Sequence, residues 1–134
     1  MEEAFDTVDE DCVQKLDYAG LRRLDALMED MEYFYGPNWQ GTVQPTKGAQ
    51  KYVARIQEVA NGKEPRLLIA HQYTRYLGDL FGGQMMSSMA SKSLSLEGGK
   101  GTGFYTFDKI EDNTAFITEW YTKLNEMDLS DKEK

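Results

Sequence analysis

The stretch GDLFGGQ, residues 78–84, places three glycines within six residues of a segment that otherwise has a strong helical pattern. Its flanks, PRLLIAHQYTRY and MMSSMASKSLSL, consist largely of residues that fit a helix. Each glycine inside a helix costs about 1 kcal/mol relative to alanine, so the cluster gives up roughly 3 kcal/mol. A helix that keeps such a cluster is expected to use its bare backbone for a specific contact.

Gly78 and Gly82 are four residues apart, so they remove side chains from two successive turns of one helix face. At about 100° per residue, that face also carries His71, Arg75 and Met89, flanked by Thr74, Asp79, Met85 and Met86. Something flat could lie against the bare backbone, and the helix could bend there. Two ordinary alternatives remain open: close packing of another helix, or a helix end at Gly82-Gly83. Arg75 and Asp79 could equally form a surface pair.

Apolar periodicity elsewhere predicts an all-α fold. We expect a helix over residues 16–34 ended by Gly36-Pro37, and a second over 52–60 ended by Asn61-Gly62. A third should run from Pro65 through the glycines to about Leu96. Asp112 or Asn113 should cap a fourth, which carries Phe116, Trp120 and Leu124. FYTF, residues 104–107, could be a short extended piece between a flexible EGGKGTG loop and that last helix.

The bulk properties of the chain narrow its class. Its 134 residues suit one domain, which we divide into an acidic segment, residues 1–15, and a helical domain, residues 16–134. A net charge of −8 argues against nucleic acid and anionic membrane surfaces as partners. No apolar run approaches the ~20 residues of a membrane span, and the single cysteine, Cys12, fits a reducing compartment. We therefore expect a soluble intracellular protein, cytoplasmic by default.

Several chemistries find no support in the sequence. One histidine and one cysteine cannot build a zinc cluster, so we predict no metal site of that kind. Cys12 lies in an acidic stretch, which disfavours a reactive thiolate paired with His71. EGGKGTG lacks the spacing of a phosphate-binding loop. Ser130 and Glu133 have the spacing of a capping box, which predicts the start of a further helix.

The segment LLIAHQYTRYLGDLFGGQ resembles the distal-helix signature of the heme oxygenases, A-H-x-Y-T-R-Y-L-G-D-L-S-G-G-Q. The segments MEDMEYFYGPNW, AQKYVARIQEV, FYTFDKI and LNEMDLS resemble family segments in the same order. The chain is thereby identified as a member of this family, of the biliverdin-producing eukaryotic type, from about Leu16 onward. The resemblance implies a heme oxygenase-like helical bundle.

The resemblance also implies a function and a set of site residues. The reaction is oxidation of heme to biliverdin, carbon monoxide and iron, using dioxygen and electrons from an NADPH-dependent reductase or a ferredoxin. In the family the distal helix bends over heme, so Gly78 and Gly82 would contact the macrocycle and Phe81 would lie beside them. Asp79 would support dioxygen through ordered water. The remaining matched residues would join that network or lie near a heme propionate: Arg75, Thr74 and Tyr73.

This sequence departs from the family pattern in several places. The axial histidine of the family lies on an N-terminal helix, yet no histidine precedes His71, which shares a helix with Gly78 and is not expected to be the ligand. We expect the family bundle to lack this proximal helix and its C-terminal helix. Ile117 and Tyr121 stand where mammalian members carry a lysine and an arginine near the propionates. Apolar faces left exposed would favour a homo-oligomer or a completing chain.

Three functions therefore compete. The chain could be a heme-degrading oxygenase, a non-catalytic tetrapyrrole-binding protein, or a helical interaction module derived from the family. The intact glycines, Arg75 and Asp79 favour the first. The missing axial histidine favours the others and weighs against turnover by the isolated chain.

Overall fold

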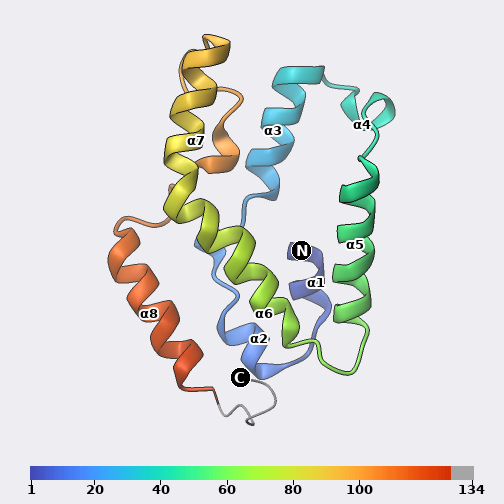
Figure 1. Cartoon of the computed structure of the whole chain (residues 1–134), viewed down its shortest axis with the longest axis vertical. Helices are drawn as coiled ribbons and strands as arrows, with labels where there is room; N and C mark the ends of the chain where they lie inside the picture. The colour runs from blue at the N-terminus through green and yellow to red at the C-terminus, as the bar shows by residue number, and fades with distance from the viewer. Residues whose placement is uncertain (128–134) are drawn as a thin grey trace.

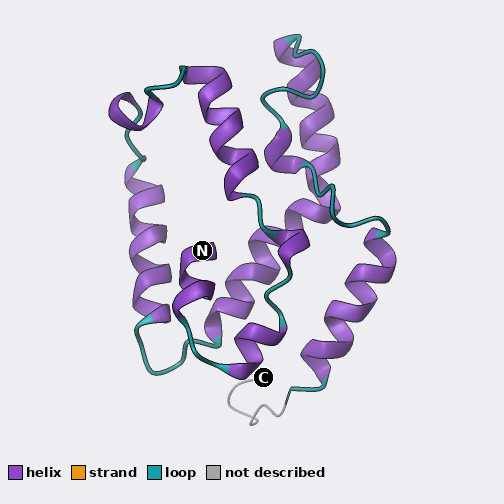
Figure 2. Ribbon diagram, turned by 180° about the vertical axis from the view of Figure 1, so that it is seen from behind, coloured by secondary structure: helices purple, strands orange, loops and turns teal. Residues whose placement is uncertain are grey.

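The computed structural model describes residues 1–127, and every regular element in this range is helical (Figures 1 and 2). The expected all-α class is confirmed. The α-helices are α1 (Glu2–Thr7), α2 (Asp11–Lys15), α3 (Leu24–Tyr35), α4 (Trp39–Thr42), α5 (Lys47–Ala60), α6 (Leu67–Gln72), α7 (Gly78–Leu94) and α8 (Asn113–Asn125). Two short 3-10 helices, η1 (Ala19–Leu21) and η3 (Gly103–Tyr105), and a π-helix, η2 (Tyr73–Leu77), complete the set.

The central element is a continuous column made of α6, η2 and α7, which crosses the middle of the molecule in Figure 1. In that view α3 and α5 lie on one side of the column and α8 lies on the other. Helix α1 packs against α5, and η3 packs against both α3 and α7. The column itself packs against α5 through α6 and against η3 through α7, and it carries the glycine cluster.

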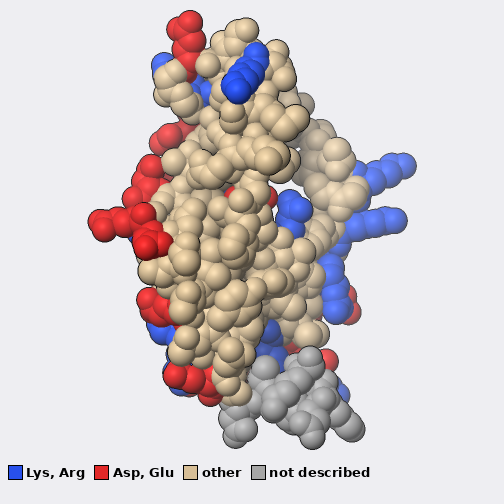
Figure 3. Space-filling view, turned by 60° about the vertical axis from the view of Figure 1, so that its left-hand side comes forward, with Lys and Arg blue, Asp and Glu red and all other residues tan. Residues whose placement is uncertain are grey.

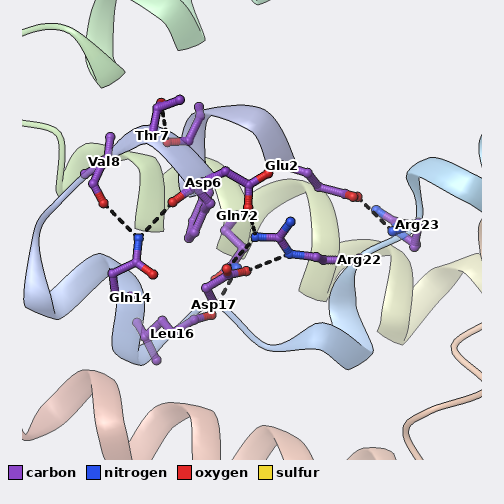
Figure 4. Close-up of polar contacts among 12 residues, drawn as sticks. Glu2, Asp6, Thr7, Val8, Gln14, Leu16, Asp17, Arg22, Arg23 and Gln72 are labelled. Atoms are coloured by element: carbon purple, nitrogen blue, oxygen red, sulfur yellow. Dashed lines mark hydrogen bonds and ion pairs between the residues drawn. The ribbon is translucent and has the colours of Figure 1, made fainter.

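Among the described residues, one hydrophobic cluster joins the N-terminal helices α1 and α2 to α8. Residues 1–15 are acidic, yet α1 and α2 contribute Phe5 and Val13 to the same cluster as Leu68 and Trp120. The side chain of Gln14 donates to the carbonyls of Phe5 and Val8, both at 2.8 Å, which ties α2 to α1 (Figure 4). Glu3, Asp6, Asp9 and Asp11 of this segment are exposed to water while Ala4, Phe5, Val8 and Val13 are buried, so it packs as part of the bundle.

Local signals explain most helix ends. The Thr46 hydroxyl accepts from the Ala49 amide at the start of α5, and the Asp112 carboxylate accepts from two amides at the start of α8. Gly36 ends α3 with a φ of +80°, a conformation that L side chains rarely adopt. Helix α5 ends at Ala60, directly before Asn61-Gly62. Of the two caps that the sequence allowed, Asp112 and Asn113, the structure has Asp112, and the predicted ends at Gly36 and Asn61 are confirmed.

The helix expected over residues 16–34 begins only at Leu24, so that prediction was wrong for residues 16–23. Leu16 and Leu21 are buried almost completely, whereas Leu24 and Leu27 on α3 are exposed. The regular leucine spacing therefore does not mark one buried helix face. The first two leucines enter the core from a turn and from η1, and the second pair lies on the outside of α3.

The FYTF stretch, expected as a possible extended piece, instead begins in the 3-10 helix η3. The buried carboxylate of Asp30 on α3 accepts from the amides of Gly103 at 2.9 Å and Phe104 at 2.8 Å. Both carboxylate oxygens are used, which fixes this turn against α3. The capping box at Ser130–Glu133 lies outside the described residues.

Truncating Phe5 tests whether α1 belongs to the core. We expect Phe5→Ala to lower the free energy of unfolding by about 3–5 kcal/mol, because a fully buried aromatic ring is replaced by a cavity. Glu3→Gln, an exposed change on the same helix, should stay within about 0.5 kcal/mol. Urea unfolding followed by circular dichroism measures both. Equal, small effects of the two changes would mean that α1 is not part of the cooperative core.

Candidate functional site

The glycine cluster follows a local change in the helix. Residues 73–77 form one π-helical turn, and α7 starts directly afterwards at Gly78. A π-turn holds more residues than an α-turn, so a projection at about 100° per residue does not carry across it. Such turns are frequent at functional sites. The structure therefore places His71 and Gly78 on the same column but in a different angular relation from the one the sequence suggested.

The three glycines have different surroundings. An added Cβ at Gly78 or Gly82 would meet no atom of residues 1–127 within 4 Å, and both glycines are exposed. At Gly83 the same atom would lie 2.9 Å from Cδ1 of Tyr105, so this glycine permits close contact with η3. Helix α7 runs through Gly82 and Gly83 without a break, so the alternative of a helix end there was wrong. Close packing explains Gly83 and leaves Gly78 and Gly82 facing open space.

Large apolar side chains are exposed along the same helix. Phe81 is 60% exposed and Met85 is 71% exposed, and Met86 and Met89 are more than half exposed. These residues and the two open glycines form what we call the open α7 face: Gly78, Phe81, Gly82, Met85, Met86 and Met89. The space-filling view in Figure 3 has a broad uncharged surface, with charged side chains concentrated at its edges. The open α7 face therefore offers bare backbone and thioethers to an apolar ligand.

Asp79 lies beside the open glycines, and a buried side chain binds its carboxylate from the inner side. Nη1 of Arg23 lies 3.1 Å from Oδ2 of Asp79, and the side chains are 3% and 22% exposed respectively. Asp79 therefore pairs with a residue 56 positions earlier in the chain rather than in the surface pair with Arg75 that the sequence allowed. Its carboxylate is half-buried, so one side of it reaches the solvent.

Arg75 and Thr74 lie on the exposed side of the π-turn. The guanidinium carbon of Arg75 lies 5.9 Å from the centre of the Tyr52 ring on α5. The Thr74 hydroxyl donates to the Ala70 carbonyl at 2.9 Å, a bond within the helix that leaves its oxygen free to accept. Both residues can contact a ligand, but neither is held as firmly as Asp79.

Tyr73 forms an aromatic cluster with α8. Its ring stacks on Trp120 with centroids 5.8 Å apart, and its hydroxyl accepts from Tyr121 at 3.0 Å. That hydrogen bond raises the pKa of the Tyr121 phenol, which stays neutral near pH 7. The pair borders a largely apolar groove of about 400 Å³ between α6 and α8, lined among others by Leu67, Ala70, Tyr73, Tyr121 and Leu124. Glu64 and Arg66 also line this groove, so hydroxyl groups, apolar carbon and one charged side chain of each sign are available there.

His71 is occupied by a neighbouring helix. Its Nδ1 lies 3.3 Å from the Tyr52 hydroxyl, and the two rings pack edge to face at 5.5 Å. Partial burial and the positive charge of Arg55 lower the pKa of His71 below its usual value. Within residues 1–127, no group of three or more histidine, cysteine or acidic side chains is arranged to hold a metal ion.

Sequence reasoning missed the residues that support Asp79. Arg23 and Asp30 lie on or beside α3, outside the glycine motif, and Tyr76 lies inside the motif, in the π-turn, but no role was predicted for it. The guanidinium carbon of Arg23 lies 4.1–4.8 Å from the ring centres of Tyr76, Phe104 and Phe107. These contacts join residues more than 50 positions apart, so no local spacing could have revealed them.

Comparison with known proteins gives the family. The sequence profile of the family described as heme oxygenase matches residues 1–134. The chain belongs to the heme oxygenase family. It is 39% identical to a heme oxygenase of Porphyra purpurea over 132 residues, which are 98% of this chain and 56% of that protein. It is 46% identical to heme oxygenase 2 of Rattus norvegicus over 115 residues, which are 85% of this chain and 36% of that protein.

Solved structures give the same fold. The chain matches heme oxygenase-2 of Synechocystis sp. PCC 6803, crystallised with heme and NO, with a TM-score of 0.90 and 38% identity. The match covers 98% of this chain and 57% of that one. The heme oxygenase of Leptospira interrogans matches with a TM-score of 0.86 and 40% identity, over 98% and 64% of the two chains. Across residues 1–127, no helix has both the length and the apolar character needed to cross a bilayer.

Alanine substitutions should separate the three glycines. We expect Gly78→Ala and Gly82→Ala each to raise the free energy of unfolding by about 0.5–1 kcal/mol, because a helix-interior glycine is replaced where there is room. Gly83→Ala should instead lower it by about 1–3 kcal/mol, because the methyl group meets Tyr105. Urea unfolding of the ligand-free chain measures all three. A loss of stability at Gly82 as large as that at Gly83 would contradict the open α7 face.

The environment of His71 predicts a pH dependence of stability. Its pKa is lowered in the folded chain, so the fold favours the neutral ring, and stability is fully present above the unfolded value of 6.5. As the pH falls from roughly 7.5 to 5.5, the unfolded chain binds the proton first and stability decreases. His71→Gln should have a flatter profile in this window, measured by urea unfolding at several pH values. Identical slopes for the two proteins would remove His71 as the cause.

Proposed function

We propose that the chain provides the distal side of a heme site and acts in the oxidative cleavage of heme to biliverdin, carbon monoxide and iron. The observation that carries this proposal is the open pair Gly78 and Gly82 with Asp79 between them, held from behind by Arg23. The residues fit a flat apolar ligand, because a Cβ at either glycine would occupy the space next to the backbone. Phe81 and Met85 extend the apolar contact on either side of Gly82.

When bound, heme would supply both the iron at which dioxygen is reduced and the carbon skeleton that is oxidised, with electrons from a reductase. The part of the chain's own residues is binding and proton handling. Gly78 and Gly82 would let the backbone of α7 approach the macrocycle, and the half-buried Asp79 carboxylate would hold water and a proton beside it. Arg75 and Thr74 could extend that polar network from the preceding turn.

The aromatic pair would lie at the edge of the site. Tyr73 and Tyr121 present hydroxyl groups joined by a hydrogen bond, and such groups can donate to a propionate carboxylate. Their contribution is weaker than that of a lysine or arginine, because a neutral donor gives no ion pair. Binding would therefore depend mainly on apolar contact along α7.

The neutral hydroxyl pair of Tyr73 and Tyr121 favours a second candidate, a tetrapyrrole-binding protein without turnover. Tyr121 is neutral where a cation would hold the propionate more strongly, and His71 is engaged with Tyr52. The two candidates differ in whether the bound heme is consumed. They share the open α7 face as the binding surface.

Hemin titration tests the binding step. We expect saturable, one-to-one binding in the presence of imidazole, which supplies an axial ligand, followed by the absorption spectrum of the bound heme. Gly82→Leu should weaken this affinity by about tenfold or more, since a branched side chain would fill the contact surface. Lys63→Gln, an exposed change in the α5–α6 connection, is the control. No saturable binding by the unaltered chain, with or without imidazole, would contradict the proposal.

Supplying electrons separates the two candidates. With hemin bound, a reductase and its electron donor should convert the heme absorption into that of biliverdin if the chain is an oxygenase. Asp79→Asn should abolish this conversion and leave hemin affinity within about twofold. The reason is that the proposed role of the carboxylate is proton transfer, and it contributes little to the binding of hemin. Stable heme absorption over many minutes in the unaltered chain would favour the binding protein.

A further inference from the structure

Arg23 is buried in a position that ordinary core packing does not explain. It is 4% exposed, and its guanidinium lies among three aromatic rings, those of Tyr76, Phe104 and Phe107. Its Nε is buried without a hydrogen-bond partner among the described residues. A buried charge with an unused donor is costly, so an arginine kept here needs a reason beyond filling space.

The reason lies in what the guanidinium bonds. Nη1 donates to Oδ2 of Asp79 at 3.1 Å and to the carbonyl of Phe104 at 3.1 Å, and Nη2 donates to the carbonyl of Arg75 at 3.4 Å. The Arg23 side chain thus connects three parts of the chain: the Asp79 carboxylate on α7, the 3-10 helix η3 through the Phe104 carbonyl, and the π-turn η2 through the Arg75 carbonyl. A guanidinium can do this because its donors are fixed in one plane, whereas an ammonium is a single point of charge.

The supporting contacts are themselves fixed. Asp30 binds the amides of Gly103 and Phe104 and so sets the position of the Phe104 carbonyl. Glu2 accepts from the backbone amide of Arg23 at 2.7 Å and from the Tyr76 hydroxyl at 3.0 Å. Figure 4 shows the side chain of Glu2 reaching toward Arg23. Burial and the nearby Glu2 charge raise the pKa of Tyr76 well above its usual range, so this phenol stays a neutral donor.

The consequence concerns the orientation of Asp79. The arginine holds Oδ2, and among the described residues Oδ1 has no hydrogen-bond partner. A carboxylate anchored through one oxygen on the inner side must turn its other oxygen away from the anchor. We propose that Arg23 is a positioning residue: by bonding Asp79, the Phe104 carbonyl and the Arg75 carbonyl together, it fixes the Asp79 side chain in one rotamer that presents Oδ1 at the open α7 face. The role toward heme rests on the proposed function, but the rotamer does not.

Three-bond couplings between the Asp79 Cγ and its backbone nitrogen and carbonyl carbon, measured by NMR on the ligand-free chain, test the proposal. They report the side-chain rotamer directly. In the unaltered chain we expect one rotamer populated to about nine-tenths, falling to about half in Arg23→Gln, which cannot reach all three acceptors. Arg22→Gln is the matched control: it removes a neighbouring ion pair to Asp6 and Asp17 and should leave the Asp79 couplings unchanged.

Two outcomes would overturn the proposal. One is rotamer-averaged couplings for Asp79 in the unaltered chain; the other is unchanged couplings in a folded Arg23→Gln chain. If Arg23→Gln does not fold, Arg23→Lys decides by the same criterion, since all three donors of an ammonium sit on one nitrogen, which cannot take the two positions that Nη1 and Nη2 occupy. A purely structural role for Arg23 would change stability and leave the rotamer of Asp79 as it is.

The hemin experiment keeps the two proposals apart. Failure of the unaltered chain to bind hemin would count against the proposed function, while the couplings of the ligand-free chain would still decide the role of Arg23. If hemin binds and the Asp79 couplings are averaged, the site stands and the positioning role fails. If hemin binds and the couplings are those of one rotamer, relaxation of the Asp79 Cγ by ferric iron should be enhanced in the unaltered and Arg22→Gln chains and at least halved in Arg23→Gln.

Discussion

The buried ion pair between Arg23 and Asp79 is the interaction on which the arrangement of the site depends. It connects the start of α3 with the start of α7, and through the Phe104 carbonyl it also reaches η3. Removing one partner of a buried pair typically costs 3–5 kcal/mol, roughly, because the other charge is left uncompensated. The aromatic rings around the guanidinium offset part of the desolvation through cation–π contact. The ion pair thus serves to fix the relative positions of α3, α7 and η3 more than to add net stability.

The π-turn and the glycines act on the same segment in complementary ways. The π-turn, Tyr73–Leu77, widens the helix directly before Gly78 and brings the Arg75 carbonyl within 3.4 Å of Arg23. After it, α7 resumes with Leu80 buried, Asp79 half-buried and Gly78 exposed. One turn of helix therefore has an apolar anchor, a carboxylate held from the interior and bare backbone on its outside.

Much of the fold could be predicted from the sequence, and the failures have a common cause. Caps and breakers are local, so Asp112, Gly36 and Asn61 marked helix ends correctly. The helix expected from Leu16 failed because Leu16 and Leu21 satisfy a helical spacing while lying in a turn and a 3-10 helix. The role of η3 and the ion pair of Asp79 depend on Asp30 and Arg23, which are more than 50 residues away from their partners. Long-range contacts leave no periodic trace, whereas the resemblance of the glycine motif pointed directly to Gly78 and Gly82.

The energetic balance of α7 indicates where function resides. Gly83 lowers helix stability, but the absence of a side chain lets Tyr105 pack against the helix, and this packing offsets the loss. Gly78 and Gly82 cost about the same, roughly 1 kcal/mol each, and no described residue of the ligand-free chain occupies the space they leave. The exposed Phe81 and Met85 beside them add a further unfavourable exposure of apolar surface. The open α7 face thus has three locally unfavourable features: a helix glycine at Gly78, another at Gly82, and exposed apolar side chains beside them. Such a concentration is expected where a ligand, rather than the fold, completes the contact.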